Sequence, residues 1–238
     1  MTQSFGTLYG VGVGPGDPEL LTLKAARLLG RAHTVFAAAS TKNDSSLALS
    51  IARPHLTPDA QVEMLGFPMT RDQAILERAW QDNARRVLMP LRRSKDVVFL
   101  TLGDPLLYST FAYLVRTLLA MEPDVPIQSV PGITSFQAAA SRTGTVLAES
   151  GENLLVLSGV RDSDELRGHL ECADNAAVLK AYRNFGQIRD TLRDLDLMDN
   201  SCFVTRLGLD GEAVYQDLDQ VPDAPHYFSL VLMKKKPA

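Results

Sequence analysis

The first half of the chain alternates short apolar runs with stretches of helical periodicity, and this alternation limits the possible folds more than any other feature. Residues 96–101 are dense in apolar and β-branched side chains, as expected of a strand that is covered on both faces. Residues 73–88 instead place Leu76, Trp80 and Ala84 on one face of a helix. Repeated alternation of this kind predicts a mostly parallel sheet with helices on its faces. The strands expected in this half are residues 8–13, 34–37, 61–65, 96–101 and 127–130, and the helices are residues 20–29, 45–51, 73–88 and 110–121.

A break containing two prolines, at residues 121–126, interrupts this alternation and favours a domain boundary. We expect a first α/β domain over residues 1–130 and a second over residues 131–238. Strands are more frequent after the break, which predicts a mixed α/β domain with hairpin pairing near its end. The strands expected there are residues 153–157, 177–181, 201–206, 213–215 and 227–233, and the helices are residues 134–141, 164–170 and 187–195.

Composition narrows the class of protein. The 238 residues are 45% apolar and 22% charged, as in ordinary globular proteins. The net charge of −4 gives no electrostatic reason to expect nucleic acid as a partner. No apolar run approaches the roughly 20 residues that a membrane helix needs, and the first residues lack the features of a secretory leader. We therefore expect a cytoplasmic protein that has no membrane partner.

Cysteine and histidine show no pattern of metal ligands. Cys172 and Cys202 lie far apart in the sequence, and the four histidines are scattered. Because neither C-x-x-C nor H-x-x-x-H spacing occurs, we expect no protein-bound metal. Both cysteines are expected to be reduced.

Three loops rich in glycine or proline each follow a predicted strand, and open α/β sheets bind ligands at the carboxyl ends of their strands. The first loop, residues 10–18, fails the G-x-G-x-x-G test, because Pro15 or Asp17 stands where the third glycine should be. It also fails the phosphate-loop test, because no lysine follows Gly16. Structurally it predicts a tight turn, with Asp17 as helix cap and Pro18 at the first helical position. Its glycines also leave the backbone open to close contact with a ligand.

The second loop, residues 101–109, places Gly103 and Asp104 directly after a buried strand. An acid at this position can cap the next helix, or it can bind a ligand that carries hydroxyl or amino groups. The pattern alone leaves both roles open.

The third loop, residues 130–136, turns at a Pro-Gly pair, and Thr134 or Ser135 is expected to cap the helix that follows. Exposed amides and hydroxyls at a helix start can also hold a carboxylate.

Taken together, the three loops resemble those of the tetrapyrrole methylase family, which acts in corrin and sirohaem biosynthesis. The segments GVGPGDPELLTLKA (residues 12–25), TLGDPLLYST (101–110) and VPGITSF (130–136) match in order and spacing, and the resemblance covers essentially the whole chain. Within the family, FPMTRDQAILERAW (67–80) and FLTLGDPLLYSTFAYL (99–114) are similar to the branch that methylates C20 of precorrin-2 or cobalt-factor-2.

The resemblance implies the tetrapyrrole methylase fold, which has two α/β domains with a ligand cleft between them, and it implies a homodimer. It also implies C-methylation at C20 of precorrin-2 or cobalt-factor-2 in cobalamin biosynthesis, with S-adenosylmethionine as the methyl donor. The donor-binding residues that it implies are Pro15, Gly103, Asp104, Leu107, Thr134, Ser135, Tyr182, Leu207 and Phe228. By residue type alone, Tyr182 and Phe228 could equally belong to a hydrophobic core.

A tetrapyrrole substrate of this kind carries several acetate and propionate groups, which arginine binds through paired hydrogen bonds. The basic residues in or near loops are Arg71, Arg142, Arg161, Lys180, Arg183 and Arg206, of which we select Arg71 and Arg183 as substrate-binding. We also expect Gly14, Gly16 and Asp17 to face the macrocycle rather than the donor.

No catalytic residue is assigned. The sulfonium of the donor loses its positive charge as the methyl group leaves, so the reaction needs positioning and a dry site more than a strong acid or base. The alternatives are a uroporphyrinogen or precorrin-4 methylase, a diphthine synthase that acts on a protein, or a non-catalytic module that binds S-adenosylmethionine. A phosphate-loop hydrolase is disfavoured by the missing lysine.

Overall fold

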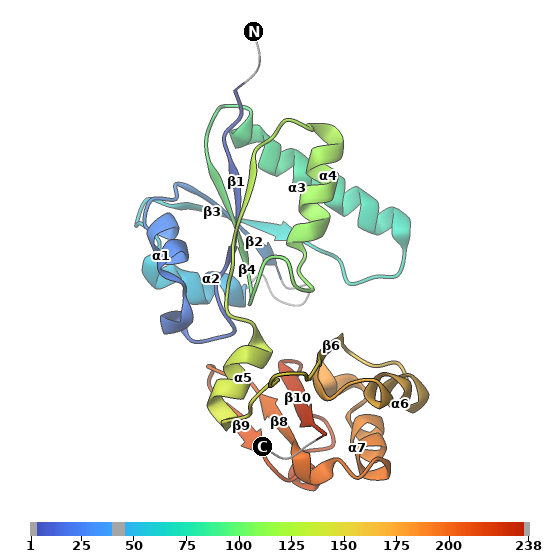
Figure 1. Cartoon of the computed structure of the whole chain (residues 1–238). Coiled ribbons are helices and arrows are strands. Elements are labelled where there is room, and N and C mark those ends of the chain that lie inside the picture. The colour runs from blue at the N-terminus through green and yellow to red at the C-terminus, as the bar shows by residue number, and fades with distance from the viewer. Residues whose placement is uncertain (1–3, 40–45, 236–238) are drawn as a thin grey trace. The chain divides into compact units, whose positions relative to one another are not determined.

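The computed structural model describes residues 4–39 and 46–235, and the chain divides into two compact units, Met1–Thr134 and Ser135–Ala238. Each unit is built around one five-stranded sheet (Figure 1). The two units part after Thr134, whereas the boundary was expected after residue 130, at the end of strand β5, Ile127–Val130.

The sheet of the first unit is entirely parallel, as predicted. Its strand order is β3-β2-β4-β1-β5, and every neighbouring pair runs in the same direction. The central strand β4 is buried along its whole length, in agreement with its apolar sequence. The strands besides β5 are β1 (Leu8–Gly12), β2 (Thr34–Ala39), β3 (Gln61–Gly66) and β4 (Val97–Thr101).

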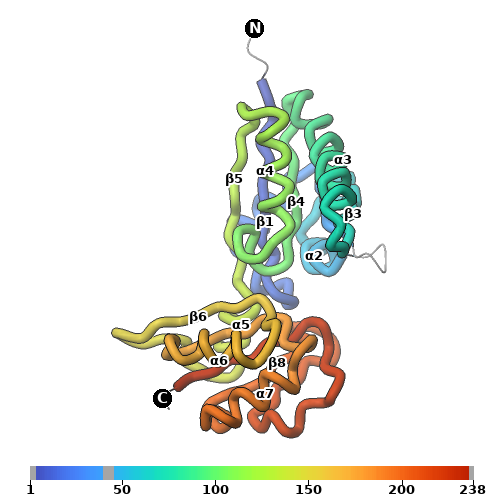
Figure 2. Tube along the Cα trace, turned by 90° about the vertical axis from the view of Figure 1, so that its right-hand side faces the viewer, coloured from blue at the N-terminus to red at the C-terminus, as the bar shows by residue number. Residues whose placement is uncertain are grey.

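Four helices cover the two faces of this sheet. Helices α1 and α2 pack on one face in a cluster that includes Val11 and Val35, and α3 and α4 pack on the other face around Leu8 and Phe99 (Figure 1). Helices α3 and α4 also lie against each other (Figure 2). The bounds are α1 Leu23–Leu29, α2 Leu47–Ala52, α3 Gln73–Leu91 and α4 Phe111–Met121.

The helix predicted over residues 20–29 is interrupted. Asp17 caps a short 3₁₀ turn, η1 (Pro18–Leu20), by accepting a hydrogen bond from the Glu19 N–H at 2.8 Å, and Pro18 stands first in that turn as expected. Thr22 then adopts an extended conformation, and its hydroxyl accepts from the Ala25 N–H. A second capping residue therefore restarts the chain as α1.

Two expectations about α3 are also corrected. The helix continues past Leu88 to Leu91, with Pro90 inside its last turn. Trp80 is only half-buried, although its spacing placed it on the core face. Its ring stacks on Tyr113 of α4, with ring centres 5.0 Å apart, so it covers the contact between the two helices rather than the sheet. The helix predicted over residues 45–51 begins at Leu47 with Ser46 as its cap, and Ser45 lies outside the described residues.

The second unit has a mixed sheet, as predicted. The strand order is β6-β7-β10-β8-β9; β6 and β7 are parallel, the other pairs are antiparallel, and β8 with β9 forms the expected hairpin. The strands are β6 (Leu154–Ser158), β7 (Asn175–Leu179), β8 (Ser201–Thr205), β9 (Ala213–Tyr215) and β10 (Ser229–Lys234).

Three helices belong to this unit: α5 (Ser135–Thr143), α6 (Ser163–Glu171) and α7 (Phe185–Asp194). Helices α6 and α7 share a buried cluster with the sheet, in which Phe185 packs edge-on against Phe203. Short 3₁₀ turns complete the chain: η2 (Arg53–His55), η3 (Ala181–Arg183), η4 (Met198–Asn200) and η5 (Leu218–Gln220). Within the described ranges, no helix is both long and apolar enough to cross a membrane.

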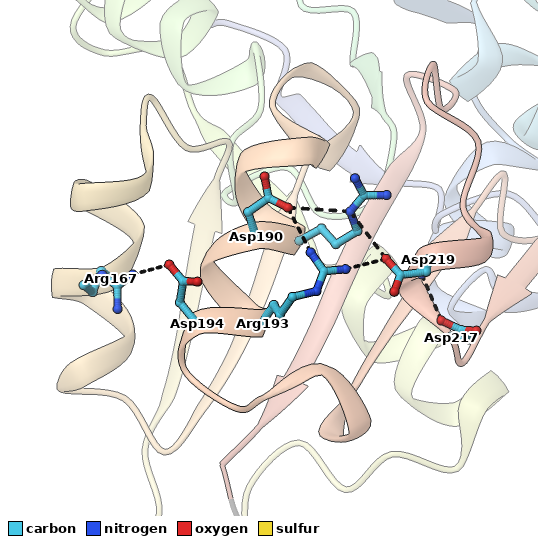
Figure 3. Close-up of polar contacts among 7 residues, drawn as sticks. Arg167, Asp190, Arg193, Asp194, Asp217 and Asp219 are labelled. Carbon is cyan, nitrogen blue, oxygen red and sulfur yellow. Dashed lines mark hydrogen bonds and ion pairs between the residues drawn. The ribbon is translucent and has the colours of Figure 1, made fainter.

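Arginine–aspartate contacts hold the outer face of α7 (Figure 3). Arg167 of α6 donates to Asp194 at 2.8 Å. Arg193 donates both to Asp190 on its own helix, at 3.1 Å, and to Asp219 of η5, at 2.5 Å. These contacts link α6, α7 and η5 of the second unit.

Candidate functional site

The first sheet has a switch point between β1 and β4, which are neighbours. Strand β1 is followed by α1 on one face of the sheet, and β4 is followed by α4 on the other. The loops that leave the carboxyl ends of these strands therefore diverge, and open α/β sheets bind their ligands at such a point.

The three predicted loops meet at this point. We call residues 13–17, 102–109 and 131–134 the loop cluster. The Gly14 N–H donates to the Gly103 carbonyl at 3.3 Å, and the Gly103 N–H donates back to the Gly14 carbonyl at 2.8 Å. A β-carbon placed on Gly132 would lie 2.1 Å from the Gly103 oxygen, and one placed on Gly12 would lie 2.6 Å from the Gly132 nitrogen. Only glycine permits this contact between three backbones.

Asp104 joins two of these loops. One carboxylate oxygen accepts from the Leu106 N–H at 2.8 Å, and the other accepts from the Gly132 N–H at 3.1 Å. It is not the cap of the next helix, because α4 begins only at Phe111, whose N–H donates to the Ser109 hydroxyl. The capping role considered for Asp104 is thus wrong. A carboxylate has about four lone-pair sites, so Asp104 can still accept from a ligand.

The glycine-rich loop is tightly held. Gly14, Pro15 and Gly16 are buried, and Gly14 has a φ of +79°, a left-handed conformation that favours glycine. Asp17 is half-buried and serves as the cap of η1. The structure therefore brings this loop beside Gly103, and the expectation that it faces the macrocycle stays a prediction.

The second loop exposes apolar side chains to which the sequence analysis gave no role. Leu106 is 69% exposed and Tyr108 is 54% exposed, and Tyr108 has a φ of +49°. Their neighbour Leu107, a predicted donor contact, is half-buried. The signal that could have identified them is an apolar run directly after Gly-Asp-Pro, in a segment too short to be a helix.

The predicted donor residues of the second unit gather at one edge of its sheet. The carboxyl ends of β7 and β8 flank the start of β10, since Leu230 pairs with Leu179 and Ser229 pairs with Thr205. Tyr182, in the turn after β7, and Leu207, after β8, are both half-buried.

Phe228 precedes β10 at the same end of the sheet. We call residues 180–183, 206–207 and 226–228, at this end of the strands, the β7–β8 edge. Its carbonyl accepts from the Arg206 N–H at 2.8 Å. The ring of Tyr227 lies 5.2 Å from the ring of Tyr182. The structure therefore brings these segments together, and their contact with a donor remains a prediction.

The electrostatics of the β7–β8 edge are positive. Burial and the nearby Arg183 lower the pKa of Lys180. Burial and Arg206 lower the pKa of His226, and burial raises the pKa of Tyr227. The lowered pKa values of Lys180 and His226 disfavour one more positive charge at this edge, whereas Arg183 opposes the effect of burial on the pKa of Tyr227.

The remaining basic candidates have different surroundings. Arg142 pairs with Glu212 at 2.6 Å, and Arg161 pairs with Glu165 at 3.2 Å. Arg71 is exposed just before α3 in the first unit.

Neither cysteine forms a disulfide: Cys172 is exposed, and Cys202 is buried, which raises the pKa of its thiol. Among the residues that the structure describes, no group of three or more His, Cys, Asp or Glu side chains could hold a metal ion. A surface pocket lined by Thr145, Ser201 and Lys234 lies at the opposite edge of the second sheet and contains none of the predicted site residues.

Residues 7–222 match the model of the tetrapyrrole (corrin/porphyrin) methylases. The match covers far more than half of the chain, so this protein belongs to the tetrapyrrole methylase family. The membership confirms the resemblance seen in the loops, and the two α/β domains confirm the predicted fold class. The cleft expected between the domains stays a prediction.

Particular relatives narrow the comparison. A cobalt-precorrin-2 C(20)-methyltransferase of Salmonella typhimurium is 34% identical over 233 residues, which are 97% of each chain. A precorrin-2 C(20)-methyltransferase of a Sinorhizobium species is 32% identical over 96% of this chain and 95% of the relative. The structure of a uroporphyrin-III C-methyltransferase from Thermus thermophilus, complexed with S-adenosylhomocysteine, is 26% identical with a TM-score of 0.69 and covers 97% of this chain and 92% of that chain.

Proposed function

We propose that this protein is an S-adenosylmethionine-dependent methyltransferase that adds a methyl group to C20 of precorrin-2, or of its cobalt-containing counterpart, in cobalamin biosynthesis. The observation that carries the proposal is the similarity, over nearly the full length of both chains, to two relatives named for this reaction. The uroporphyrin-III methyltransferase of known structure is less similar to this chain, which favours the C20 reaction over that alternative.

The loop cluster suits a donor that is held mainly by backbone groups. The close contact between Gly12, Gly103 and Gly132 leaves no room for side chains there, so the loops meet through main-chain atoms. Asp104 is fixed by two amide donors, so its remaining lone pairs are pre-oriented for hydroxyl or amino groups of the donor. The exposed Leu106 supplies apolar surface beside it. S-adenosylmethionine, when bound, supplies an electrophilic methyl group on a sulfonium.

The groups in the loop cluster favour catalysis by positioning. Its only carboxylates are Asp17 and Asp104, and both accept hydrogen bonds from backbone amides. The cluster contains no histidine, lysine or arginine. Its residues are therefore suited to orient the two reactants and exclude water, while the electron density of the macrocycle drives the attack.

We infer that the partner molecule is a tetrapyrrole, that any cobalt belongs to this substrate, and that the protein works in the cytoplasm as a homodimer. The net charge of −4 supports the absence of a nucleic-acid partner. Size-exclusion chromatography with light scattering tests the homodimer, and a monomeric mass would contradict it.

The proposed function is tested by methyl-transfer assays with precorrin-2, cobalt-precorrin-2 and cobalt-factor-2 side by side, because one relative is named for each of the first two. We expect formation of S-adenosylhomocysteine together with a product one methyl group heavier. Uroporphyrinogen and precorrin-4 serve as competing substrates. Turnover of either one in preference to precorrin-2 would favour the alternative methylases. Binding of S-adenosylmethionine without transfer to any of them would favour a binding module.

A further inference from the structure

Three basic side chains at the β7–β8 edge have no acidic partner. Within residues 4–39 and 46–235, no ion pair joins Lys180, Arg183 or Arg206 to a carboxylate. Surface arginines elsewhere in the second unit do have such partners; Arg167, for example, lies 2.8 Å from Asp194. Unbalanced positive charge is thus concentrated at one edge of one sheet.

Aromatic residues link Arg183 to the backbone of Arg206, and Lys180 lies near enough to Arg183 for that arginine to lower its pKa. The Arg183 Nε donates to the Tyr182 hydroxyl at 2.9 Å, and its guanidinium carbon lies 5.7 Å from the centre of that ring. Tyr182 packs against Tyr227, and Tyr227 packs against Phe228, with ring centres 5.1 Å apart. The Phe228 carbonyl accepts from the backbone of Arg206, as described above. The guanidinium of Arg183 is therefore held at a phenol instead of at a carboxylate.

The backbone at this edge is strained. Lys180 has a φ of +54° and Arg206 has a φ of +53°, although neither is glycine. A residue with a β-carbon pays roughly 1–2 kcal/mol for this conformation, which proteins often retain at functional sites. Arg206 also buries its Nε without a hydrogen-bond partner. Buried polar atoms in folded proteins are rarely left unpaired, so this atom marks Arg206 as a residue whose hydrogen-bonding capacity the fold does not fully use.

The charge of the edge distinguishes the two ligands of the reaction. S-adenosylmethionine carries a sulfonium, an ammonium and a carboxylate, so its net charge is positive, and of its parts only the uncharged adenosine suits the donor contacts predicted at this edge, Tyr182, Leu207 and Phe228. The tetrapyrrole carries several carboxylates and has the opposite sign. Arginine pairs with carboxylates through two parallel hydrogen bonds, whereas lysine contributes a single mobile charge.

We propose that Lys180, Arg183 and Arg206 form a carboxylate-binding subsite that selects the macrocyclic substrate through its acetate and propionate groups. The proposal rests on the proposed function for the identity of that substrate. It adds two residues to the predicted substrate ligand Arg183. It also separates these three from Arg142 and Arg161, whose charges are already balanced by glutamates.

The test uses Arg183→Gln and Arg206→Gln, with Arg167→Gln as the matched control, since Arg167 is a paired arginine away from this edge. Loss of one charged hydrogen bond is expected to raise the KM for the tetrapyrrole roughly ten- to hundred-fold. We expect kcat to change little and the Kd of S-adenosylhomocysteine, measured by calorimetry, to stay within about two-fold of wild type. Arg183→Lys should recover part of the loss because it restores the charge.

A second measurement does not depend on catalysis. Uroporphyrin carries a carboxylate on every peripheral side chain, and its binding to the full chain is followed by absorbance. Coproporphyrin, which has fewer carboxylates, should bind more weakly to wild type and lose less affinity in Arg183→Gln. If wild type failed to methylate precorrin-2 but showed this pattern, the proposed function would be wrong and the subsite would stand.

Two results would overturn the subsite. One is unchanged tetrapyrrole KM and uroporphyrin affinity in both variants, with circular dichroism showing that they are folded. The other is a loss confined to S-adenosylhomocysteine binding, which would mean that the carboxylate bound here belongs to the donor.

Discussion

The close packing of the loop cluster depends on the absence of single β-carbon atoms at glycine positions. Gly12 ends strand β1, whereas Gly103 and Gly132 lie in two of the loops, and atoms of each glycine lie where the β-carbon of another would have to be. Interiors packed at this density do not absorb an added methyl group without a shift of the backbone. The presence of glycine at these positions therefore affects both the stability of the first unit and the shape of the proposed donor site.

Gly132→Ala tests this contact. Its β-carbon would lie 2.1 Å from the Gly103 oxygen and 2.8 Å from two backbone carbons of Gly12, and backbone atoms cannot move aside as a flexible side chain can. We expect a loss of about 1–3 kcal/mol in the free energy of unfolding, as for other overpacked interiors, measured by urea denaturation. S-adenosylhomocysteine affinity should fall as well. Gly66→Ala is the control, because nothing lies within 4 Å of its β-carbon position. Wild-type stability together with wild-type donor affinity in Gly132→Ala would contradict the account.

Asp17 requires a pair of variants, because it has a structural task besides its predicted contact with the macrocycle. It caps η1 through the Glu19 N–H, and asparagine caps about as well as aspartate. Asp17→Ala should lose stability on the order of 1 kcal/mol, and Asp17→Asn should not. If Asp17 faces the macrocycle, both variants weaken tetrapyrrole binding and leave S-adenosylhomocysteine binding nearly unchanged. An equal loss for both ligands would refute this placement.

Glu212 gives the second unit a pH dependence. It accepts from the Gly208 N–H and from Arg142, and these contacts lower the pKa of the carboxyl. A carboxyl group whose pKa is lower in the folded than in the unfolded protein stabilises the fold at pH values above its unfolded pKa. This contribution is lost as the pH falls through the folded pKa. Glu212→Gln should therefore be less stable than wild type at pH 7, by about 1 kcal/mol for a charged hydrogen bond. The difference should shrink in acid.

The measurement is urea denaturation of both proteins across the acid range. Glu77→Gln is the control, because Glu77 is exposed on α3. A difference between wild type and Glu212→Gln that stays constant with pH would show that the charge of Glu212 does not contribute.

At the level of elements, α7 is held on its outer face by shared carboxylates. Asp219 of η5 lies 2.5 Å from Arg193 and 3.7 Å from Arg189 (Figure 3). Asp219→Asn would leave the two arginines without this common partner. We expect a fall in Tm of at most about 5 °C at low salt that largely disappears at high salt, because exposed ion pairs are weak and screened. Asp223→Asn, at an exposed site nearby, should change Tm little at either salt concentration. A salt-independent loss in Asp219→Asn would point to packing instead of charge.

The elements themselves were predictable where one face or both faces are buried. Strand β4 is apolar up to its last residue, Thr101, and this apolar run predicts its place inside a parallel sheet. The break at Thr22 was not predicted. Asp17 and Thr22 are both good capping residues, and each of them starts its own helical segment, η1 and α1. Trp80 was misplaced because periodicity gives the face of a helix but not its partner, which here is Tyr113 on α4.

The site was predictable only as a set of loops. The residue types of Gly103 and Asp104 indicated a ligand contact, but the hydrogen bond from Gly132 to Asp104 spans 28 positions and depends on the register of β1, β4 and β5. The cations of the β7–β8 edge illustrate the same limit. The sequence offered six basic candidates, and only the structure shows which of them already have acidic partners.

At the scale of the whole molecule, the chain has one parallel and one mixed sheet, as its sequence pattern led us to expect, and it belongs to the tetrapyrrole methylase family. The first unit supplies a switch point with three joined loops, and the second supplies an edge with unbalanced positive charge. We assign the carboxylates of the substrate to the cations of that edge and the methyl donor to the loop cluster, while the donor contacts of Tyr182, Leu207 and Phe228 at the same edge stay a prediction.

The central claim, methylation at C20, is tested most directly by locating the transferred methyl group. The full chain is incubated with S-adenosylmethionine whose methyl carbon is carbon-13, and with precorrin-2 or cobalt-factor-2, and the product is analysed by NMR. We expect a single labelled methyl group, attached at C20, from at least one of the two substrates. A label at any other ring position, or donor binding with no labelled product from either substrate, would contradict it.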